Sequence, residues 1–275
     1  MNIQQIVSAC ILGAFVTTGM AQVETNFIIF TGGAMDKNWY NPNNWSYQKF
    51  TGSPGVPDTH AEVRVTAGAS LDITNAVTVE YFKNGCEGRK GIAGNVMIDG
   101  GILLATGTTQ YNSVCFNRRA SLTVKNGGSA TFNTRLVVGF KDCQGGSLVI
   151  HDGSIRVVGT YYHQTDYTGT EAINTRTTIH TGGLLDVNDM ILNAGVVDIA
   201  GGVLLIRGLA VDAADQWVSS GRIIAMNGID GWQIKVSYDE ETGWTKLTAE
   251  QEPILLGQNS PAPEHKRNNP IARNG

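Results

Sequence analysis

Four polar side chains that could act on a ligand recur at similar spacings in the middle of the chain. Asp99, Lys125, His151 and His180 each directly follow an aliphatic residue in a repeated pattern. If that pattern marks equivalent positions on stacked coils, the four side chains form one outer-face column with a spacing of about 4.8 Å. An acid, a cation and two imidazoles in a row can bind a polar ligand or take part in acid–base chemistry. The same residues also satisfy the general need for polar side chains at outward strand positions.

A metal site is a weaker interpretation of this column. His151, Asp152 and His180 could supply donors, but a zinc site usually has three or four protein ligands. The sequence holds no EF-hand loop, no phosphate-binding loop and no Gly-x-Ser-x-Gly nucleophile elbow. We therefore predict no metal site, no cofactor and no catalytic residue.

A second group of residues suits sugar recognition. Residues 160–175 interrupt the repeat and hold tyrosines, a histidine and two acids. Aromatic rings stack on the C–H faces of sugars, and carboxylates accept hydrogen bonds from hydroxyls. The alternative is that two of the tyrosines fold back onto the surface of a coil. The candidate ligand-binding residues are Tyr161, Tyr162, His163, Asp166, Tyr167 and Glu171.

The repeat that would position these residues is an aliphatic residue followed three positions later by glycine. Successive glycines of this pattern lie 33, 26, 26, 29 and 20 residues apart, and a short β-rich run follows each. Such units bury little apolar surface alone, so they stack into a solenoid with glycines at the corners. We expect six aliphatic residues to form one inward column: Val65, Ile98, Val124, Ile150, Ile179 and Ile199.

The predicted fold class is all-β, with residues 62–210 forming a parallel β-helix, or solenoid, of about six to seven coils. A β-sandwich is the competing fold, but a sandwich has no reason to repeat one unit at a fixed glycine phase. The composition of 34 glycines in 275 residues, with 16% charged residues, agrees with a turn-rich β protein. A net charge of −4 without a long basic run argues against a nucleic-acid partner.

Aromatic caps are expected at both ends of the solenoid, where the core would otherwise be open. Residues 22–61 form the predicted N-terminal cap, and residues 211–249 form C-terminal cap strands. All the tryptophans lie in these two segments: Trp39, Trp45, Trp217, Trp232 and Trp244. Residues 250–275 are polar and rich in proline, which indicates a linker or disordered tail and fits a part of a larger multi-module protein.

Residues 1–21 have the pattern of a cleavable signal peptide. They carry no charge, their centre is apolar, and Gly19 and Ala21 place small residues at the −3 and −1 positions. Cys10 precedes the apolar stretch rather than following it, which argues against a lipoprotein anchor. No segment is long and apolar enough to span a membrane. We predict a secreted or cell-surface protein.

Removal of the signal would leave Cys86, Cys115 and Cys143. Neighbouring coils, about 4.8 Å apart, are within the reach of a disulfide, whereas a Cys86–Cys143 bridge would span two coils. The sequence leaves open Cys86–Cys115, Cys115–Cys143 and no bridge at all. Of the two bridges Cys115–Cys143 is favoured, because its positions along the coil differ by two residues rather than three.

The opening segment also carries a resemblance. Residues 39–46 (WYNPNNWS) and 55–58 (GVPD) resemble the start of exported bacterial β-solenoid proteins with a W-x-N-P-x-N-W motif. The glycine-cornered coils and the closing strands resemble the same group, so the resemblance covers about residues 30–249. It implies export and a solenoid, often joined to lectin-like or sorting segments. The activity of that group is mostly unassigned, so no catalytic residue is implied, and the sorting signal of some members is missing here.

Two functions remain open from the sequence. The first is a non-catalytic extracellular scaffold, an adhesion or glycan-binding module whose partner is an extracellular polysaccharide or a cell-surface glycan. The second is a small β-helix lyase or hydrolase acting on an acidic polysaccharide, with Asp99, Lys125 and His151 nearest to a site. The absence of a convincing catalytic cluster favours the first.

Overall fold

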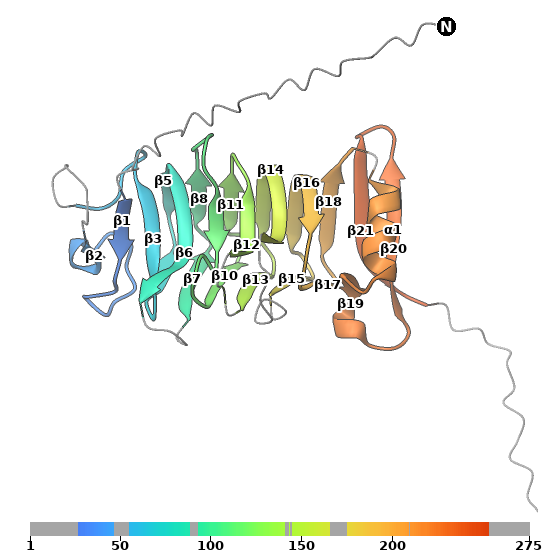
Figure 1. Ribbon diagram of the computed structural model, residues 1–275, viewed down its shortest axis with the longest axis horizontal. Helices are drawn as coiled ribbons and strands as arrows, with labels where there is room; N and C mark the ends of the chain where they lie inside the picture. Colours follow the sequence, from blue (N-terminus) through green and yellow to red (C-terminus); the bar gives the residue numbers. More distant parts are fainter. Residues whose placement is uncertain are drawn as a thin grey trace, which may run out of the picture.

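The chain folds into a parallel β-solenoid of about five turns (Figure 1). The computed structural model describes residues 27–46, 55–88, 93–140, 143, 145–165, 175–208 and 210–252. The all-β solenoid prediction is confirmed, and the β-sandwich is excluded because successive strands pair in parallel across coils. The predicted count of six to seven coils is not confirmed. The predicted signal peptide, residues 1–21, lies outside the described residues.

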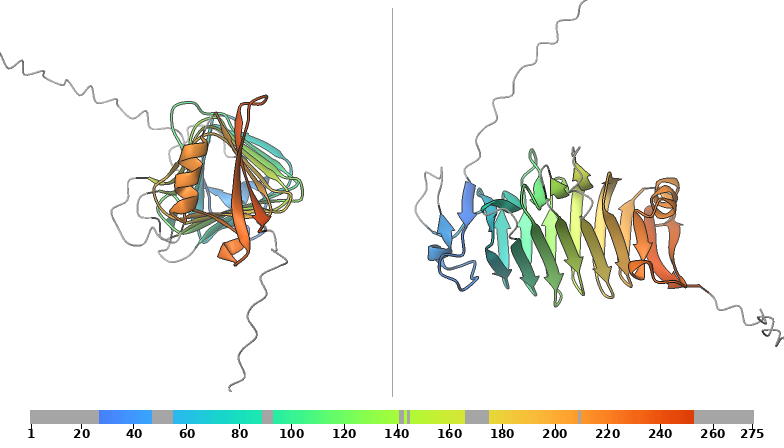
Figure 2. Two further views of the ribbon diagram at one scale, coloured as in Figure 1. Left: turned by 90° about the vertical axis from the view of Figure 1, so that its right-hand side faces the viewer. Right: turned by 60° about the horizontal axis from the view of Figure 1, so that its bottom comes forward.

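Each turn has three sides, which we number in chain order. The first side is a seven-stranded sheet. Its strands are β4 (Ser70–Ile73), β7 (Gly94–Asp99), β10 (Ala120–Lys125), β13 (Gly146–Ile150), β15 (Arg176–His180), β17 (Val196–Ala200) and β19 (Ile223–Ala225). Figure 2 shows these coils end-on and from below.

The second and third sides belong to one larger sheet, because two long strands turn the corner between them. The second side holds β5 (Ala76–Val79), β8 (Ile102–Ala105), β11 (Ser129–Phe132) and β18 (Val203–Arg207). The third side holds β3 (Glu62–Ala67), β6 (Tyr81–Gly88), β9 (Asn112–Val114) and β12 (Leu136–Phe140). The strands β14 (Ser154–Thr165) and β16 (Leu184–Leu192) contribute their first residues to the second side and their later residues to the third.

The predicted inward column is correct for five of its six members. Ile98, Val124, Ile150, Ile179 and Ile199 are paired from coil to coil on the first side, and all are fully buried. The assignment of Val65 to this column is wrong. Val65 is buried, but it lies on the third side between Phe30 and Asn84, and Ile73 pairs with Ile98 in its place. The aliphatic-x-x-glycine pattern at residue 65 is therefore a coincidence of sequence and belongs to another corner.

Glycines at the corner after the first side leave no room for a side chain. A Cβ atom on Gly153 would lie 2.4 Å from the carbonyl oxygen of Gly128 on the preceding coil. A Cβ atom on Gly202 would lie 2.4 Å from the carbonyl oxygen of His180. Such a contact would displace the backbone of the preceding coil, so these corner positions require glycine. The recurrence of glycine in the sequence therefore reflects the stacking of one corner on the next.

The N-terminal end of the solenoid is built around two tryptophans. The strand β1 (Phe27–Phe30) extends the third side, and β2 (Trp45–Ser46) pairs with it after a short 3₁₀ turn, η1 (Pro42–Asn44). Trp39 and Trp45 are buried, with ring centroids 4.9 Å apart, and the Trp45 indole N–H donates to the Trp39 carbonyl at 2.8 Å. Both tryptophans are therefore part of the hydrophobic core at this end.

The C-terminal end differs from the expectation of strands alone. Residues Val211–Ser219 form a helix, α1, followed by a 3₁₀ turn, η3 (Met226–Gly228), and the hairpin β20 (Trp232–Asp239) and β21 (Trp244–Gln251) (Figure 1). The helix has an apolar face, since Ala214 is buried and Trp217 and Val218 pack against the core. The strand β21 runs antiparallel to β18. The role of either end as a cap stays a prediction.

No helix within the described part of the chain has the length and apolar character needed to cross a membrane.

Candidate functional site

The predicted polar column exists as a row on the outer surface of the first side. Lys125 is paired in register with Asp99, and His180 with Ala200. On these coils Val124 pairs with Ile150, and Ile150 pairs with Ile179. Lys125, His151 and His180 directly follow these three residues. The structure therefore brings together all four residues expected from the sequence, and we call Asp99, Lys125, His151 and His180 the polar ladder.

The first half of the polar ladder is an ion pair supported by an amide. The ammonium of Lys125 lies 3.1 Å from a carboxylate oxygen of Asp99, and the side-chain amide of Asn126 donates to the other oxygen at 2.6 Å. The hydrogen bond from Asn126, followed by that from Lys125, lowers the pKa of Asp99 below its usual value. Asp99 is therefore an ionised hydrogen-bond acceptor at neutral pH.

The second half of the polar ladder is a stack of two imidazoles. The rings of His151 and His180 are 4.5 Å apart between centroids and lie within 6° of parallel. Partial burial, followed by repulsion from His151, lowers the pKa of His180, although the carboxylate of Asp198 acts in the opposite direction. Asp152 accepts a hydrogen bond from the backbone N–H of Asn126. Among the described residues no group of three histidines, cysteines or acids is arranged to hold a metal ion.

The candidate sugar-binding segment does not present its described residues as a platform. Tyr161 and His163 point inward and are fully buried, which corrects their assignment as ligand-binding residues. The Tyr161 hydroxyl lies 2.5 Å from the Thr177 hydroxyl, and His163 Nδ1 lies 2.8 Å from the Ala194 carbonyl oxygen. Tyr162 is only half-buried on the outer surface of the third side. Asp166, Tyr167 and Glu171 lie outside the described residues.

Burial has a strong effect on the two inward groups. Desolvation raises the pKa of Tyr161. Desolvation, opposed by the hydrogen bond to Ala194, lowers the pKa of His163 to about 4. Both groups are therefore neutral at neutral pH and act as internal hydrogen-bonding groups of the coil.

The cysteines form one bridge between adjacent coils. Cys115 and Cys143 are joined by a disulfide with a Cα–Cα distance of 5.7 Å, and the buried Cys86 is not part of this bridge. Of the three possibilities that the sequence left open, Cys115–Cys143 is confirmed. A Cys86–Cys115 bridge and the absence of any bridge are both wrong. The disulfide ties the corner that leads from the third side back to the first.

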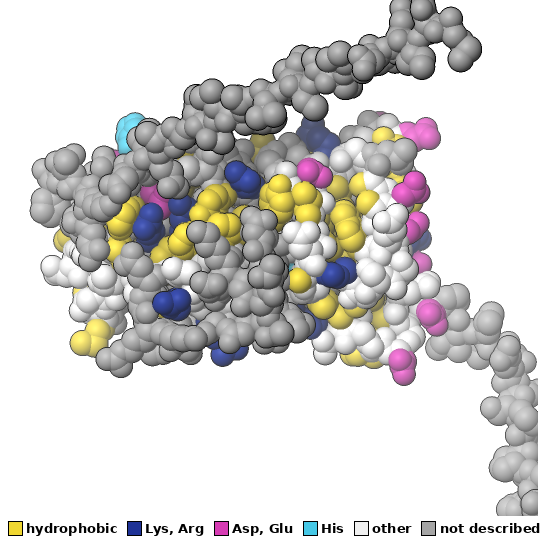
Figure 3. All heavy atoms as spheres, in the orientation of Figure 1, with side chains coloured by type: hydrophobic (Ala, Val, Ile, Leu, Met, Phe, Trp, Pro, Cys, Tyr) yellow, Lys and Arg dark blue, Asp and Glu magenta, His cyan; other side chains and the backbone are white. Residues whose placement is uncertain are grey.

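The sequence did not single out an aromatic cluster on the third side. Phe116 and Phe140, from adjacent coils, stack at 5.3 Å, and Tyr111 lies 4.7 Å from the Phe140 ring. Beneath them Lys83 is almost fully buried and forms a 2.8 Å ion pair with Glu62. The face shown in Figure 3 carries a row of hydrophobic side chains with lysines and arginines beside it. Residues 116 and 140 differ by 24, close to one coil, which is the signal that could have identified their stacking.

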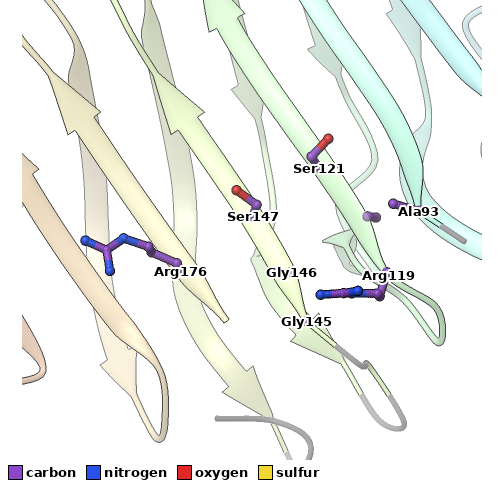
Figure 4. Close-up of a pocket in the computed structure, with 8 residues that line it drawn as sticks. Ala93, Arg119, Ser121, Gly145, Gly146, Ser147 and Arg176 are labelled. Carbon is purple, nitrogen blue, oxygen red and sulfur yellow. The ribbon is translucent and has the colours of Figure 1, made fainter. Parts of the chain in front are cut away.

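The sequence also missed a cleft on the first side, at the opposite ends of the strands from the polar ladder (Figure 4). It encloses about 320 Å³. Arg119, the second residue of a basic pair at positions 118–119, lines this cleft. The residues that shape it include Arg119, Ser121, Gly145, Gly146, Ser147 and Arg176. Ser121, Ser147 and Arg176 are spaced by 26 and 29 residues, so the coil period could have placed them together.

The polar ladder and the cleft share the outer surface of one sheet. Ser121 and Lys125 are four residues apart on β10, which corresponds to about 13 Å along a strand. This surface can therefore offer hydrogen-bond donors, acceptors and positive charge over the width of the sheet and across several coils. No protein-family model, curated protein or solved structure matches the chain.

Proposed function

We propose that this protein is an exported, non-catalytic β-solenoid scaffold that binds a glycan on the outer surface of its first side. It would act in the extracellular space or at a cell surface, as an adhesion or glycan-binding module. The observation that carries the proposal is the polar ladder, which places an acid, a cation and two imidazoles in register on successive coils.

The construction of the solenoid favours an outer binding surface. Its interior is filled by buried side chains, including the aliphatic inward column of the first side. A ligand can therefore bind only to the outer surface, where equivalent positions on neighbouring coils lie about 4.8 Å apart. A polysaccharide also repeats its hydroxyl groups, so one chain can satisfy several rungs of the polar ladder through donors and acceptors together.

The state of the ladder groups favours binding over catalysis. Asp99 has a lowered pKa and is held by Lys125 and Asn126, so it is a poor general acid at neutral pH. Lys125 in turn is engaged with Asp99. These interactions fix the two side chains as hydrogen-bonding partners for a ligand.

Two features support an extracellular setting. The pattern of residues 1–21 is that of an export signal. The Cys115–Cys143 disulfide is of a kind that persists in oxidising compartments and is rare in the cytosol.

The test is a glycan array combined with a depolymerisation screen on the full chain. The ladder variant carries Lys125→Ala with His151→Ala, and the matched control carries Lys246→Ala with His60→Ala, two exposed residues elsewhere. We expect glycan binding by the wild type and the control, and at least a fivefold loss in the ladder variant. Equal binding by both variants, or binding to no glycan, would overturn the proposal. Release of shortened polysaccharide products would instead support the lyase or hydrolase.

A further inference from the structure

We infer that the cleft at the start of β10, β13 and β15 is a subsite for an oxyanion carried by the glycan, a carboxylate or a sulfate group. This inference rests on the proposed function and specifies its ligand as an anionic polysaccharide. The two sources of the oxyanion, uronic acids and sulfate esters, share the same recognition chemistry and are separated by the experiment below.

The floor of the cleft is made of small residues and backbone. Ala120 is paired in register with Gly146, and Gly145 and Ala93 line the cleft beside them. Ala120 and Gly146 lie at inward positions, since Ala120 is buried and a Cβ atom on Gly146 would lie 3.0 Å from that of Cys115. They therefore present backbone, and no side chain, to the cleft. The backbone is therefore open to a ligand over two neighbouring coils, with arginines at either end (Figure 4).

The polar groups around this floor are donors of the kind that bind oxyanions. Ser121, Ser147 and Arg176 stand in register on three successive coils, and Arg119 reaches toward Gly145 and Gly146. A guanidinium presents a planar fork of N–H groups that matches a carboxylate or a sulfate, and the hydroxyl of Ser147 adds a single donor. The hydroxyl of Ser121 already donates to the side-chain oxygen of Asn95 at 2.8 Å. No acidic residue is among the described residues that line the cleft.

The two arginines have different roles. Asp198, which is buried, accepts from Arg176 at 2.7 Å, and Asn227 accepts from the same nitrogen at 2.8 Å. These contacts orient Arg176 and neutralise its charge. Arg119 is exposed and makes no ion pair with any residue that the structure describes, so it supplies the positive charge that an oxyanion would meet.

The size and position of the cleft fit one charged group of a longer chain. About 320 Å³ is at the lower end of ligand-pocket volumes and suits one sugar residue rather than an oligosaccharide. The polar ladder begins about 13 Å away along the strands. A polysaccharide that crosses the sheet could place its charged group in the cleft and its hydroxyls on the ladder.

The overall charge of the protein makes the inference easy to test. The chain carries a net charge of −4, so general electrostatics oppose binding to an anionic polymer. The experiment measures binding of the full chain to immobilised polygalacturonate, dextran sulfate and neutral dextran at physiological salt. Arg119→Gln is compared with Arg135→Gln, which removes the same charge from another exposed arginine that also precedes a strand.

We expect the wild type to bind at least one anionic polymer and to bind dextran at least tenfold more weakly. Arg119→Gln should lose about tenfold in affinity for that polymer, while Arg135→Gln stays within twofold. Binding to polygalacturonate alone identifies a carboxylate, and binding to dextran sulfate alone identifies a sulfate ester. An equal loss in both variants, or none in Arg119→Gln, would overturn the subsite.

A second measurement separates failure of the subsite from failure of the proposed function. In an NMR titration with sodium galacturonate and sodium sulfate, the Nε–H signal of Arg119 should shift for one of these anions. A shift without binding to any polysaccharide supports the anion site and contradicts the glycan scaffold. Glycan binding that ignores charge, with no shift, supports the scaffold and contradicts the anion site.

Discussion

The first and third sides of the coil stack in the same way but fill the interior differently. The inward column of the first side is aliphatic through five coils, from Ile98 to Ile199. A corresponding column on the third side runs through Asn84, Val114, Val138, His163 and Leu192, and its polar members are as deeply buried as its aliphatic ones. Parallel stacking therefore requires inward side chains that fit one another, and it tolerates polar ones where they find partners.

The buried polar side chains of the third side form hydrogen bonds with backbone groups of neighbouring strands. The amide of Asn84 donates to the carbonyl of Ser121 at 2.8 Å, and Asn112 accepts from the N–H of Phe82 at 2.9 Å. His163 is bonded to the Ala194 carbonyl in the same way. Because buried backbone groups without partners are costly, side chains take over where strand pairing is interrupted.

Truncation of the aliphatic column is expected to give the largest effect. Ile150→Ala leaves a cavity between two filled coils, at a cost of about 2–5 kcal/mol of unfolding free energy. The control is Val149→Ala, the neighbouring residue on the outer surface, whose effect should stay within about 0.5 kcal/mol. Urea denaturation measures both. Equal losses from the two variants would contradict the difference between inside and outside on this side.

The disulfide between the third and first sides should contribute slightly less. It closes a loop of 28 residues, for which chain entropy predicts about 3.5 kcal/mol of stabilisation. Replacing Cys115 and Cys143 together by serine should lower stability by about this amount. Thiol counting on the denatured, unreduced mature protein should find one thiol, that of Cys86. A count of three would rule out the bridge.

The contrast between the two sides also explains what could be predicted from the sequence. The fold, the first-side column and the polar ladder follow from a repeat whose glycines mark corners. The column residues of this repeat are all aliphatic, and the residues that follow them in the ladder are all polar. The third side offers no such signal, because Asn84, Val114 and His163 share a column without sharing a chemical class. Val65 was therefore placed in the wrong column.

Tyr161 and His163 illustrate the same limit at the candidate site. Their residue types suit sugar recognition, but alternation along β14 turns both inward and only Tyr162 outward. The phase of a strand that turns a corner depends on its register with neighbouring coils, which the sequence of that segment alone does not specify. The helix α1 was missed because the repeat ends before it.

Burial of His163 should make stability depend on pH. In the folded state its pKa is lowered to about 4, so between about pH 6.5 and 4 the unfolded chain binds a proton that the folded chain does not. Stability should be complete above pH 6.5 and should fall as the pH decreases toward 4, by an amount on the order of 3 kcal/mol. His180, whose pKa is also lowered, adds a contribution in the same direction.

Denaturant titrations at pH 7 and pH 4.5 measure this dependence. The variant His163→Gln removes the titrating group from the interior of the third side, and His180→Gln removes the one on the outer surface of the first. Most of the loss between the two pH values should disappear in His163→Gln and persist in His180→Gln. An unchanged loss in His163→Gln would assign the effect to other groups.

The smallest effect is expected on the outer surface of the first side, at the ion pair of the polar ladder. Asp99 and Lys125 are each about one-third exposed, and exposed pairs contribute little because solvent screens them. Lys125→Met should therefore move the melting temperature by no more than about 2 °C.

The ion pair between Glu62 and Lys83 on the third side is the matched contrast, since both side chains are nearly fully buried. Lys83→Met would leave Glu62 buried beside Arg64 alone and should lower the melting temperature several times more. If Lys125→Met destabilised the protein as much as Lys83→Met, the ladder would be a structural element of the sheet, and its value as a binding surface would lose its basis. A stable Lys125→Met protein that no longer binds glycan would show that the ladder is maintained for the ligand.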